Sequence, residues 1–188
     1  MPQNPIPTQE AVLIKSAAKG DKQAFGVLYQ NYLEQIYRYI YYRLANSFEA
    51  EDLTENVFLK AWEALPKLAE KDENISNFRA WLYRIAHNMI VDHHRARKPS
   101  ISLDEVLSLS DSAQGPESTA SSNWDSQRLA NAIKMLEPNL QQVLVCRFIN
   151  QISHAETAKI MGLNPGHVRV LQHRALKKMA QLLEKESL

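Results

Sequence analysis

The segment of residues 153–178 constrains the fold of this chain more than any other. Ser153 and Glu156 have the spacing of a capping box, in which each side chain accepts a hydrogen bond from the other residue's backbone N–H at the start of a helix. Gly162 can adopt the left-handed conformation that ends such a helix, and Asn164, followed by a proline, can start the next one. The pattern therefore predicts two helices joined by a tight turn.

The second predicted helix is basic, because it carries several arginines and lysines and no acidic residue before Glu184. A helix-turn-helix places its second helix in the major groove of DNA, where cationic and polar side chains contact phosphates and bases. The residues of this helix and its cap that suit such contacts are Asn164, His167, Arg169, His173, Arg174, Lys177 and Lys178. On this segment alone, an ordinary helical hairpin with a solvated basic face is the alternative.

The composition excludes several classes of protein. With 188 residues and a net charge of +1, the chain is no polycation, so affinity for nucleic acid must come from local basic patches. The single cysteine, Cys146, sits in an apolar run and is expected to pack in the core rather than to act in redox chemistry. The sequence has neither an apolar run of membrane-spanning length nor the start of a signal peptide, and we expect a cytoplasmic protein without membrane insertion.

Helical spacing recurs along most of the chain, and no alternating strand pattern of useful length is present. We expect an all-α fold of two small helical domains joined by a flexible linker, with the helix-turn-helix in the second domain. The expected ranges are a disordered leader at 1–7, a first domain at 8–98, an acidic serine-rich linker at 99–123 and a second domain at 124–188. Within the first domain, Pro66 is expected to end the helix that starts near Phe48, and Ser76 to cap the next helix.

Aromatic and cationic side chains are interleaved between residues 78 and 97. Trp81, Arg84 and Asn88 recur at three- and four-residue spacing, which places them on one side of a helix. Aromatic rings offer flat surfaces to unstacked bases, and cations bind the phosphates of a strand. The pattern indicates a surface for single-stranded nucleic acid, and packing of Trp81 against neighbouring helices is an equally good interpretation.

Three histidines in the same segment, His87, His93 and His94, raise the question of a metal enzyme. No two of them have the i, i+4 spacing of a helical zinc site, and there is no second cluster of ligands. The chain also lacks a phosphate-binding glycine loop, a dinucleotide fingerprint and a nucleophile motif. We therefore expect no enzyme activity, no cofactor, no metal and no small-molecule substrate.

A third segment, residues 51–62, also has a distinctive pattern, because it combines an apolar stripe with acidic and amide side chains. Such charges usually lie on the solvated face of a bundle helix. The same face is also suited to docking a partner protein.

Three segments together, Glu51–Phe58, Phe78–Asn88 and the helix-turn-helix, resemble bacterial RNA polymerase sigma factors. The small extracytoplasmic-function (ECF) group of the sigma-70 family is the most similar, over about residues 8–98 and 124–185. The resemblance implies that the first domain corresponds to sigma region 2 and the second to sigma region 4. The function it implies is that of an alternative sigma factor, which binds core RNA polymerase and directs transcription initiation at one class of promoter.

The resemblance also implies roles for individual residues. The acidic helix would dock on the β′ clamp helices of the polymerase through Asp52, Leu53, Glu55, Asn56, Phe58 and Leu59. The minus-10 element of the promoter DNA would be recognised and melted by Asn77, Arg79, Trp81, Arg84, Asn88, Arg95 and Arg97. The basic helix of the helix-turn-helix would read the minus-35 element, helices within 124–150 would meet the β flap, and an anti-sigma factor would be the inhibitor.

The sequence departs from the family pattern in three places. Asn56 stands where many members have glutamine, His167 where many have threonine, and Leu171 where many have arginine. The missing arginine predicts a weak minus-35 reader that depends on the rest of the polymerase complex. A free-standing helix-turn-helix regulator with a helical sensor or dimerisation domain is the main alternative, and a helical metal enzyme is the third hypothesis.

Overall fold

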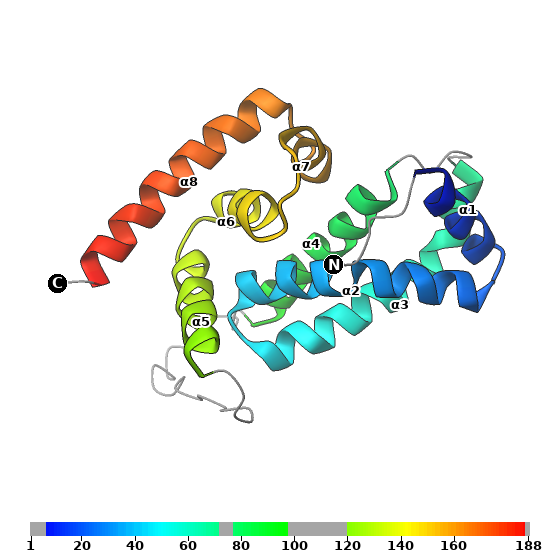
Figure 1. Cartoon of the computed structure of the whole chain (residues 1–188), viewed down its shortest axis with the longest axis horizontal. Helices are drawn as coiled ribbons and strands as arrows, with labels where there is room; N and C mark the ends of the chain where they lie inside the picture. The colour runs from blue at the N-terminus through cyan, green and yellow to red at the C-terminus, as the bar shows by residue number, and fades with distance from the viewer. Residues whose placement is uncertain (1–6, 72–76, 98–119, 187–188) are drawn as a thin grey trace.

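The computed structural model describes residues 7–71, 77–97 and 120–186, and over these residues it consists of helices and short connections without a strand. In chain order the elements are α1 (Pro7–Ala18), α2 (Lys22–Leu44), α3 (Ser47–Lys71), α4 (Phe78–Arg97), α5 (Ala120–Lys134), α6 (Pro138–Leu144), η1 (Val145–Ile149), α7 (His154–Met161) and α8 (Pro165–Glu186). They form two groups, α1–α4 and α5–α8, which lie against each other (Figure 1). The all-α architecture is therefore confirmed, whereas Ser76, most of the leader and most of the predicted linker lie outside the described residues. In the described part of the chain, each helix is too short or too polar to cross a membrane.

The first group is organised around α2, whose start follows from Asp21. The Asp21 carboxylate accepts hydrogen bonds from the backbone N–H groups of the second and third residues of α2, at 2.9 and 3.1 Å. Buried tyrosines of α2 then meet rings of α4 edge to face. Tyr32 pairs with Phe78 at a centroid distance of 5.5 Å, and Tyr39 pairs with Tyr83 at 5.0 Å. These contacts hold α4 against α2.

The helix α3 is longer than the sequence predicted. Pro66 lies inside the helix, which continues to Lys71, so the expectation that Pro66 ends it was wrong. A proline removes one backbone hydrogen bond and kinks a helix, but contacts made by the next turn can offset that loss. Here Leu68 and Ala69, which follow the proline, pack against the core.

In the second group, α6 continues into η1, a single π-helical turn. Cys146 lies in this turn and is 0% exposed, which confirms its predicted place in the core. Just after η1, Gln151 takes a left-handed conformation with φ 53° and turns the chain toward α7. The π turn therefore joins the core of the second group to its helix-turn-helix.

Candidate nucleic-acid interface

The helix-turn-helix consists of α7 and α8, and its turn forms as the capping residues predict. The Ser153 hydroxyl accepts from the Glu156 N–H at 3.2 Å, and the Glu156 carboxylate accepts from the Ser153 N–H at 3.4 Å. Gly162 ends α7 in the left-handed conformation, with φ 67°. Asn164 accepts from the His167 N–H at 2.8 Å and so caps α8. The position of α8 relative to α7 thus follows from the residues of the turn.

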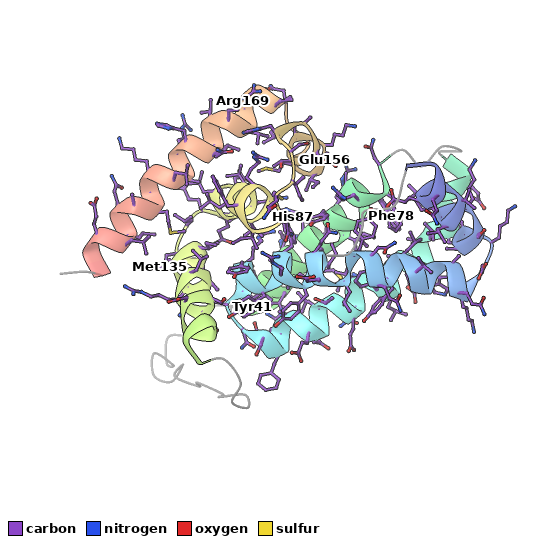
Figure 2. The ribbon with its side chains drawn as sticks, in the orientation of Figure 1. Tyr41, Phe78, His87, Met135, Glu156 and Arg169 are labelled. Atoms are coloured by element: carbon purple, nitrogen blue, oxygen red, sulfur yellow. The ribbon has the colours of Figure 1, made fainter. Side chains whose placement is uncertain are left out.

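The helix α8 has one buried and one exposed face. Val168, Leu171, Ala175 and Met179 are buried at helical spacing, where α8 contacts α6 and α7. The residues predicted to contact DNA are all exposed: Asn164, His167, Arg169, His173, Arg174, Lys177 and Lys178. Figure 2 shows Arg169 near the start of α8. The structure therefore brings the predicted minus-35 residues together on one helix that projects its cations into solvent.

Leu171 belongs to the buried face, with 8% of its surface exposed. An arginine at this position would replace a core contact, and it would add no cation to the exposed face. The prediction that a missing arginine weakens the DNA-facing surface therefore loses its basis.

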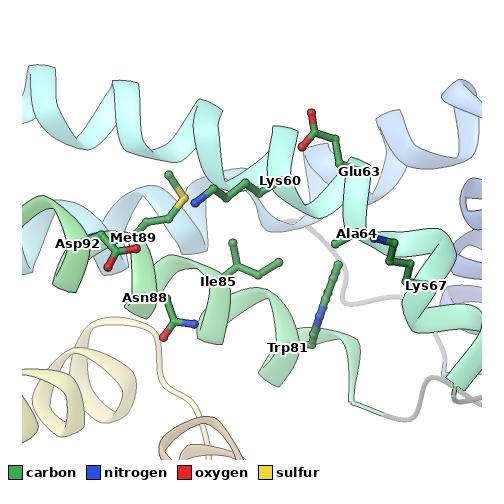
Figure 3. A pocket seen from close by; sticks show the side chains of 9 residues that line it. All are labelled: Lys60, Glu63, Ala64, Lys67, Trp81, Ile85, Asn88, Met89 and Asp92. Atoms are coloured by element: carbon green, nitrogen blue, oxygen red, sulfur yellow. The ribbon is translucent and has the colours of Figure 1, made fainter.

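An open groove of about 480 Å³ lies between α3 and α4 (Figure 3). The indole of Trp81 stands in this groove beside Ala64, half-buried, with its ring 5.6 Å from the Phe78 ring. Asn88, two turns farther along α4, also lines the groove, and Lys60 of α3 reaches toward it from the opposite wall. The groove therefore offers an aromatic ring and an amide to a single strand, while its two lysines are balanced by the carboxylates of Glu63 and Asp92.

The other predicted minus-10 residues are spread along α4 and the residue before it, outside this groove. Asn77, Arg84 and Arg95 are exposed, and the side chain of Arg97 lies outside the described residues. The Asn77 carbonyl accepts a hydrogen bond from the backbone of the first turn of α4, at 2.9 Å. The α4 residues thus do not form one continuous set, in contrast to those of α8.

Arg79 is engaged inside the protein. Its guanidinium lies 3.0 Å from the Glu156 carboxylate of α7, and 5.9 Å from the centre of the Tyr32 ring. The side chain of Arg79 is 20% exposed. In this arrangement Arg79 therefore joins α4 to the helix-turn-helix, a role that the sequence analysis did not find.

The residues predicted to dock polymerase divide between the surface and the core of α3. Asp52, Glu55 and Leu59 are exposed, and Asn56 is half-buried. Leu53 and Phe58 are 6% and 4% exposed, so the prediction that these two dock a partner was wrong. They face inward because they belong to the apolar stripe of the helix, and the Phe58 ring meets that of Tyr29 at 4.7 Å.

Phe48 is a surface residue that the sequence analysis missed. It is 64% exposed and lies one helical turn before Asp52, on the same side of α3. With Glu55 and Leu59 it forms a stripe in which apolar side chains flank acidic ones. The helical spacing of Phe48 with Asp52 and Glu55 was the signal available in the sequence.

The histidines of α4 make separate contacts with neighbouring helices. His93 lies 3.1 Å from the Glu49 carboxylate, and His87 lies 3.2 Å from the guanidinium of the buried Arg43. Burial and the Arg43 cation lower the pKa of His87, which favours its neutral form. Among the described residues there is no group of three or more side chains suited to a metal ion.

Comparison with known families matches both helical groups. Residues 28–99 match the model of Sigma-70 region 2, and residues 126–179 match that of Sigma-70 region 4. The ECF RNA polymerase sigma factor SigW of Bacillus subtilis is 31% identical over 171 residues, which cover 86% of this chain and 89% of SigW. The ECF RNA polymerase sigma factor BldN of Streptomyces coelicolor is 35% identical over 173 residues, which cover 91% of this chain and 64% of BldN.

Two solved structures share the fold. CnrH in complex with the cytosolic domain of CnrY superimposes with a TM-score of 0.73 and 24% identity, over 94% of this chain and 98% of that one. The sigma factor RpoE in complex with the anti-sigma factor NepR, from Bartonella quintana, gives a TM-score of 0.68 and 22% identity, over 85% and 96% of the two chains. At these identities the structures show a common fold alone.

Proposed function

We propose a function from one premise: the chain belongs to the ECF group of the sigma-70 family. It is a sigma factor, a protein that directs promoter-specific initiation of transcription by RNA polymerase. Sigma factors are initiation factors and not enzymes. We accordingly propose that this chain has no enzyme activity of its own, and that it acts in the cytoplasm with the polymerase.

The two helical groups divide the recognition of the promoter in this proposal. The first, assigned to residues 8–98, corresponds to region 2 and recognises and melts the minus-10 element. The second, assigned to residues 124–188, corresponds to region 4 and reads the minus-35 element through α8. Residues 99–123 are assigned to the acidic linker between them. The exposed row of cations on α8 supports this division, because phosphate contacts position a recognition helix in the major groove.

The groove between α3 and α4 is the proposed site for unpaired bases of the minus-10 element. Stacking of a base on an aromatic side chain contributes about 1–3 kcal/mol, which offsets part of the cost of unstacking that base. Trp81 supplies such a ring, and Asn88 supplies an amide in the same groove. Arg84 and Arg95, exposed on α4, would contact the phosphates of the strand.

The proposed contact with core polymerase is the exposed stripe of α3. Asp52, Glu55 and Leu59 would dock on the β′ clamp helices together with Phe48, because acids flanked by apolar side chains suit a basic, amphipathic partner helix. Helices α5 and α6 would meet the β flap. An anti-sigma factor is a further proposed partner, by analogy with the complex described for RpoE of Bartonella quintana.

Core binding and run-off transcription test this function. The purified chain should co-elute with bacterial core polymerase and start transcripts at defined sites that core alone does not use. Leu59→Ser should weaken co-elution, whereas Val12→Ser, which changes an equally exposed apolar residue of α1, should not. Tight binding to duplex DNA without any association with polymerase would support the free-standing regulator instead.

A further inference from the structure

The buried stripe of α8 holds this helix against α6 and α7 through apolar contacts. Apolar contacts are non-directional, so they fix the rotation of a helix about its axis less sharply than hydrogen bonds do. A rotation of about 20° moves a side-chain tip, which lies about 5–6 Å from the axis, by roughly 2 Å. A hydrogen bond to a base tolerates much less, because donor and acceptor must lie about 2.7–3.2 Å apart. A helix that reads bases therefore needs directional contacts to set its rotation.

Gln172 makes such contacts at one edge of the buried stripe. It follows Leu171 in α8 and is half-buried. Its side-chain oxygen, Oε1, accepts a hydrogen bond from the Arg147 Nε–H of η1 at 3.2 Å. The same oxygen lies 3.0 Å from Nε2 of His154, the first residue of α7. We call these two contacts on one oxygen the Gln172 clamp. It ties α8 to the two elements that precede it in the chain.

The chemistry of the two donors allows only one orientation of the Gln172 amide. An arginine side chain can only donate, so the atom that faces Arg147 must be the oxygen. That oxygen can only accept, so Nε2 of His154 must carry a hydrogen. The amide nitrogen of Gln172 meets no acceptor among the described residues. Turning the amide over would therefore break both contacts and form no new one in this part of the chain.

Arg147 is itself held in place by the connection between η1 and α7. Its guanidinium also donates to the carbonyl of Ile152, a residue that is 2% exposed. The Ile152 N–H in turn donates to the Cys146 carbonyl at 2.8 Å. By contrast, the Lys178–Glu137 pair farther along α8 is exposed at both residues, and ion pairs of that kind contribute little. The Gln172 clamp thus rests on a buried, hydrogen-bonded support.

We propose that Gln172 is a positioning residue of α8: held by Arg147 and His154, it sets the rotation at which the helix presents its base-reading side chains. This inference rests on the proposed function and deepens it. Arg169 and His173, which lie close to Gln172 along the helix, are both exposed. Loss of the clamp displaces them relative to the bases, but it leaves the cations available to phosphates unchanged. Gln172 therefore acts on the choice of sequence and not on non-specific affinity.

Two substitutions of Gln172 separate positioning from direct base contact. The preferred minus-35 duplex is first selected from a randomised pool with the polymerase complex of the full chain. Gln172→Leu removes the shared acceptor, and it should lower discrimination against single-base variants of that duplex roughly tenfold, at unchanged affinity for unrelated DNA. Gln172→Glu keeps an oxygen for both donors but adds a negative charge. It should weaken binding to all sequences alike and keep the discrimination within about twofold of the wild type.

Arg147→Met tests the clamp from outside α8. It should cause much of the same loss of discrimination, and it should add little to Gln172→Leu, because both changes remove the same contact. The salt dependence of binding should stay as in the wild type, since a positioning arginine neutralises no phosphate. Gln181→Leu is the matched control, because it makes the same replacement at an exposed position nearer the end of α8. It should change neither discrimination nor affinity.

Three results would overturn the positioning role. Gln172→Glu might lose as much discrimination as Gln172→Leu, which would show that the amide contacts a base directly. Arg147→Met could reduce the slope of log affinity against log salt by about 1, which would assign Arg147 to a phosphate. A loss of discrimination in Gln172→Leu that is accompanied by lost helix content in circular dichroism would reflect unfolding instead.

The clamp can also be measured without polymerase or DNA. Nitrogen NMR of the isotope-labelled full chain, at about pH 8, shows which ring nitrogen of His154 carries the hydrogen. We expect Nε2 in the wild type and in Gln172→Glu, and a mixture in Gln172→Leu. A hydrogen on Nδ1 alone in the wild type would contradict the clamp. A wild-type complex without any preference at minus 35 would contradict the proposed function, whereas a preference that Gln172→Leu leaves intact would contradict the positioning role alone.

Discussion

The helices α4 and α8 carry similar sets of amide and cationic residues, but they present them differently. On α8 the buried residues occupy one narrow stripe, and every predicted DNA contact lies outside it. On α4 the buried residues are more widely distributed, because the helix packs against α2, α3 and α7. Trp81 is consequently half-buried, and Arg79 is held by Glu156.

The difference in burial between the two helices matches the role that each has in the proposed function. A reader of duplex DNA needs only an exposed row of side chains that fits a groove already present. A helix that binds unstacked bases needs a concave surface, which requires a second helix alongside. We therefore expect substitutions on α4 to affect folding and melting together, and substitutions on the exposed face of α8 to affect binding alone.

The largest expected effect concerns stability. Leu82→Ala on α4 removes a side chain that is 0% exposed, and it should lower the free energy of unfolding by about 2–5 kcal/mol. Leu176→Ala on α8, where the leucine is 44% exposed, should change it by less than about 0.5 kcal/mol. Urea unfolding followed by circular dichroism measures both. Equal losses would mean that α8 is packed more extensively than its exposed face indicates.

The next effect concerns binding by α8. Arg174→Ala should weaken promoter binding of the polymerase complex by about 1–3 kcal/mol if the guanidinium contacts a base. It should reduce the slope of log affinity against log salt by about 1 if it contacts a phosphate. Gln181→Ala, an exposed change two turns farther along α8, is the control and should leave affinity unchanged. Unaltered binding by Arg174→Ala at moderate salt would remove this residue from the set of contacts.

A smaller effect is expected for Trp81, which tests whether α4 serves both purposes. Trp81→Ala should lower stability by about 1 kcal/mol, since the ring is half-buried, and should slow promoter melting more than it weakens core binding. Trp62→Ala removes another half-buried tryptophan, one that packs on Phe25 at 4.9 Å outside the groove. It should lower stability without a specific effect on melting, which permanganate footprinting measures. Equal effects of the two substitutions on melting would assign Trp81 to the core.

The smallest effect concerns how the free energy of unfolding depends on pH, and it involves His87 of α4. The pKa of His87 is lowered by burial and by Arg43, so the unfolded chain binds the proton more readily than the folded one. The stabilisation is therefore present above the unfolded pKa of about 6.5 and is lost as the pH falls below it. His87→Gln should make the unfolding free energy less dependent on pH between 7.5 and 5.5. An unchanged pH dependence would show that other groups dominate in this range.

The sequence predicted best where local chemistry decides the structure. The caps at Ser153, Gly162 and Asn164 act over three or four residues, so their spacing predicted the turn of the helix-turn-helix correctly. The spacing of the cations likewise predicted which residues of α8 are exposed, apart from position 171. It did not reveal that Leu171 faces inward, because the register of a recognition helix was inferred from a family pattern rather than from the buried stripe.

Tertiary contacts account for what could not be predicted. The helix α3 continues past Pro66 because later residues find a core to pack on. Leu53 and Phe58 face that same core, although their motif suggested a docking surface. The ion pair between Arg79 and Glu156 joins residues that are 77 positions apart, and no local pattern indicates such a pairing. Sequence therefore predicted α8, the proposed reader of duplex DNA, more fully than α4, the helix that packs on three neighbours.

Promoter fragments that contain one element at a time test the central claim most directly. The polymerase complex is bound either to a duplex with only the minus-35 element or to a fork whose single strand carries only the minus-10 element. We predict that Arg174→Ala weakens binding to the duplex alone, and that Trp81→Ala weakens binding to the fork alone, each by about tenfold. The division of promoter recognition between α4 and α8 would be contradicted if either variant lost binding to both fragments. It would also be contradicted if both variants bound both fragments as well as the wild type does.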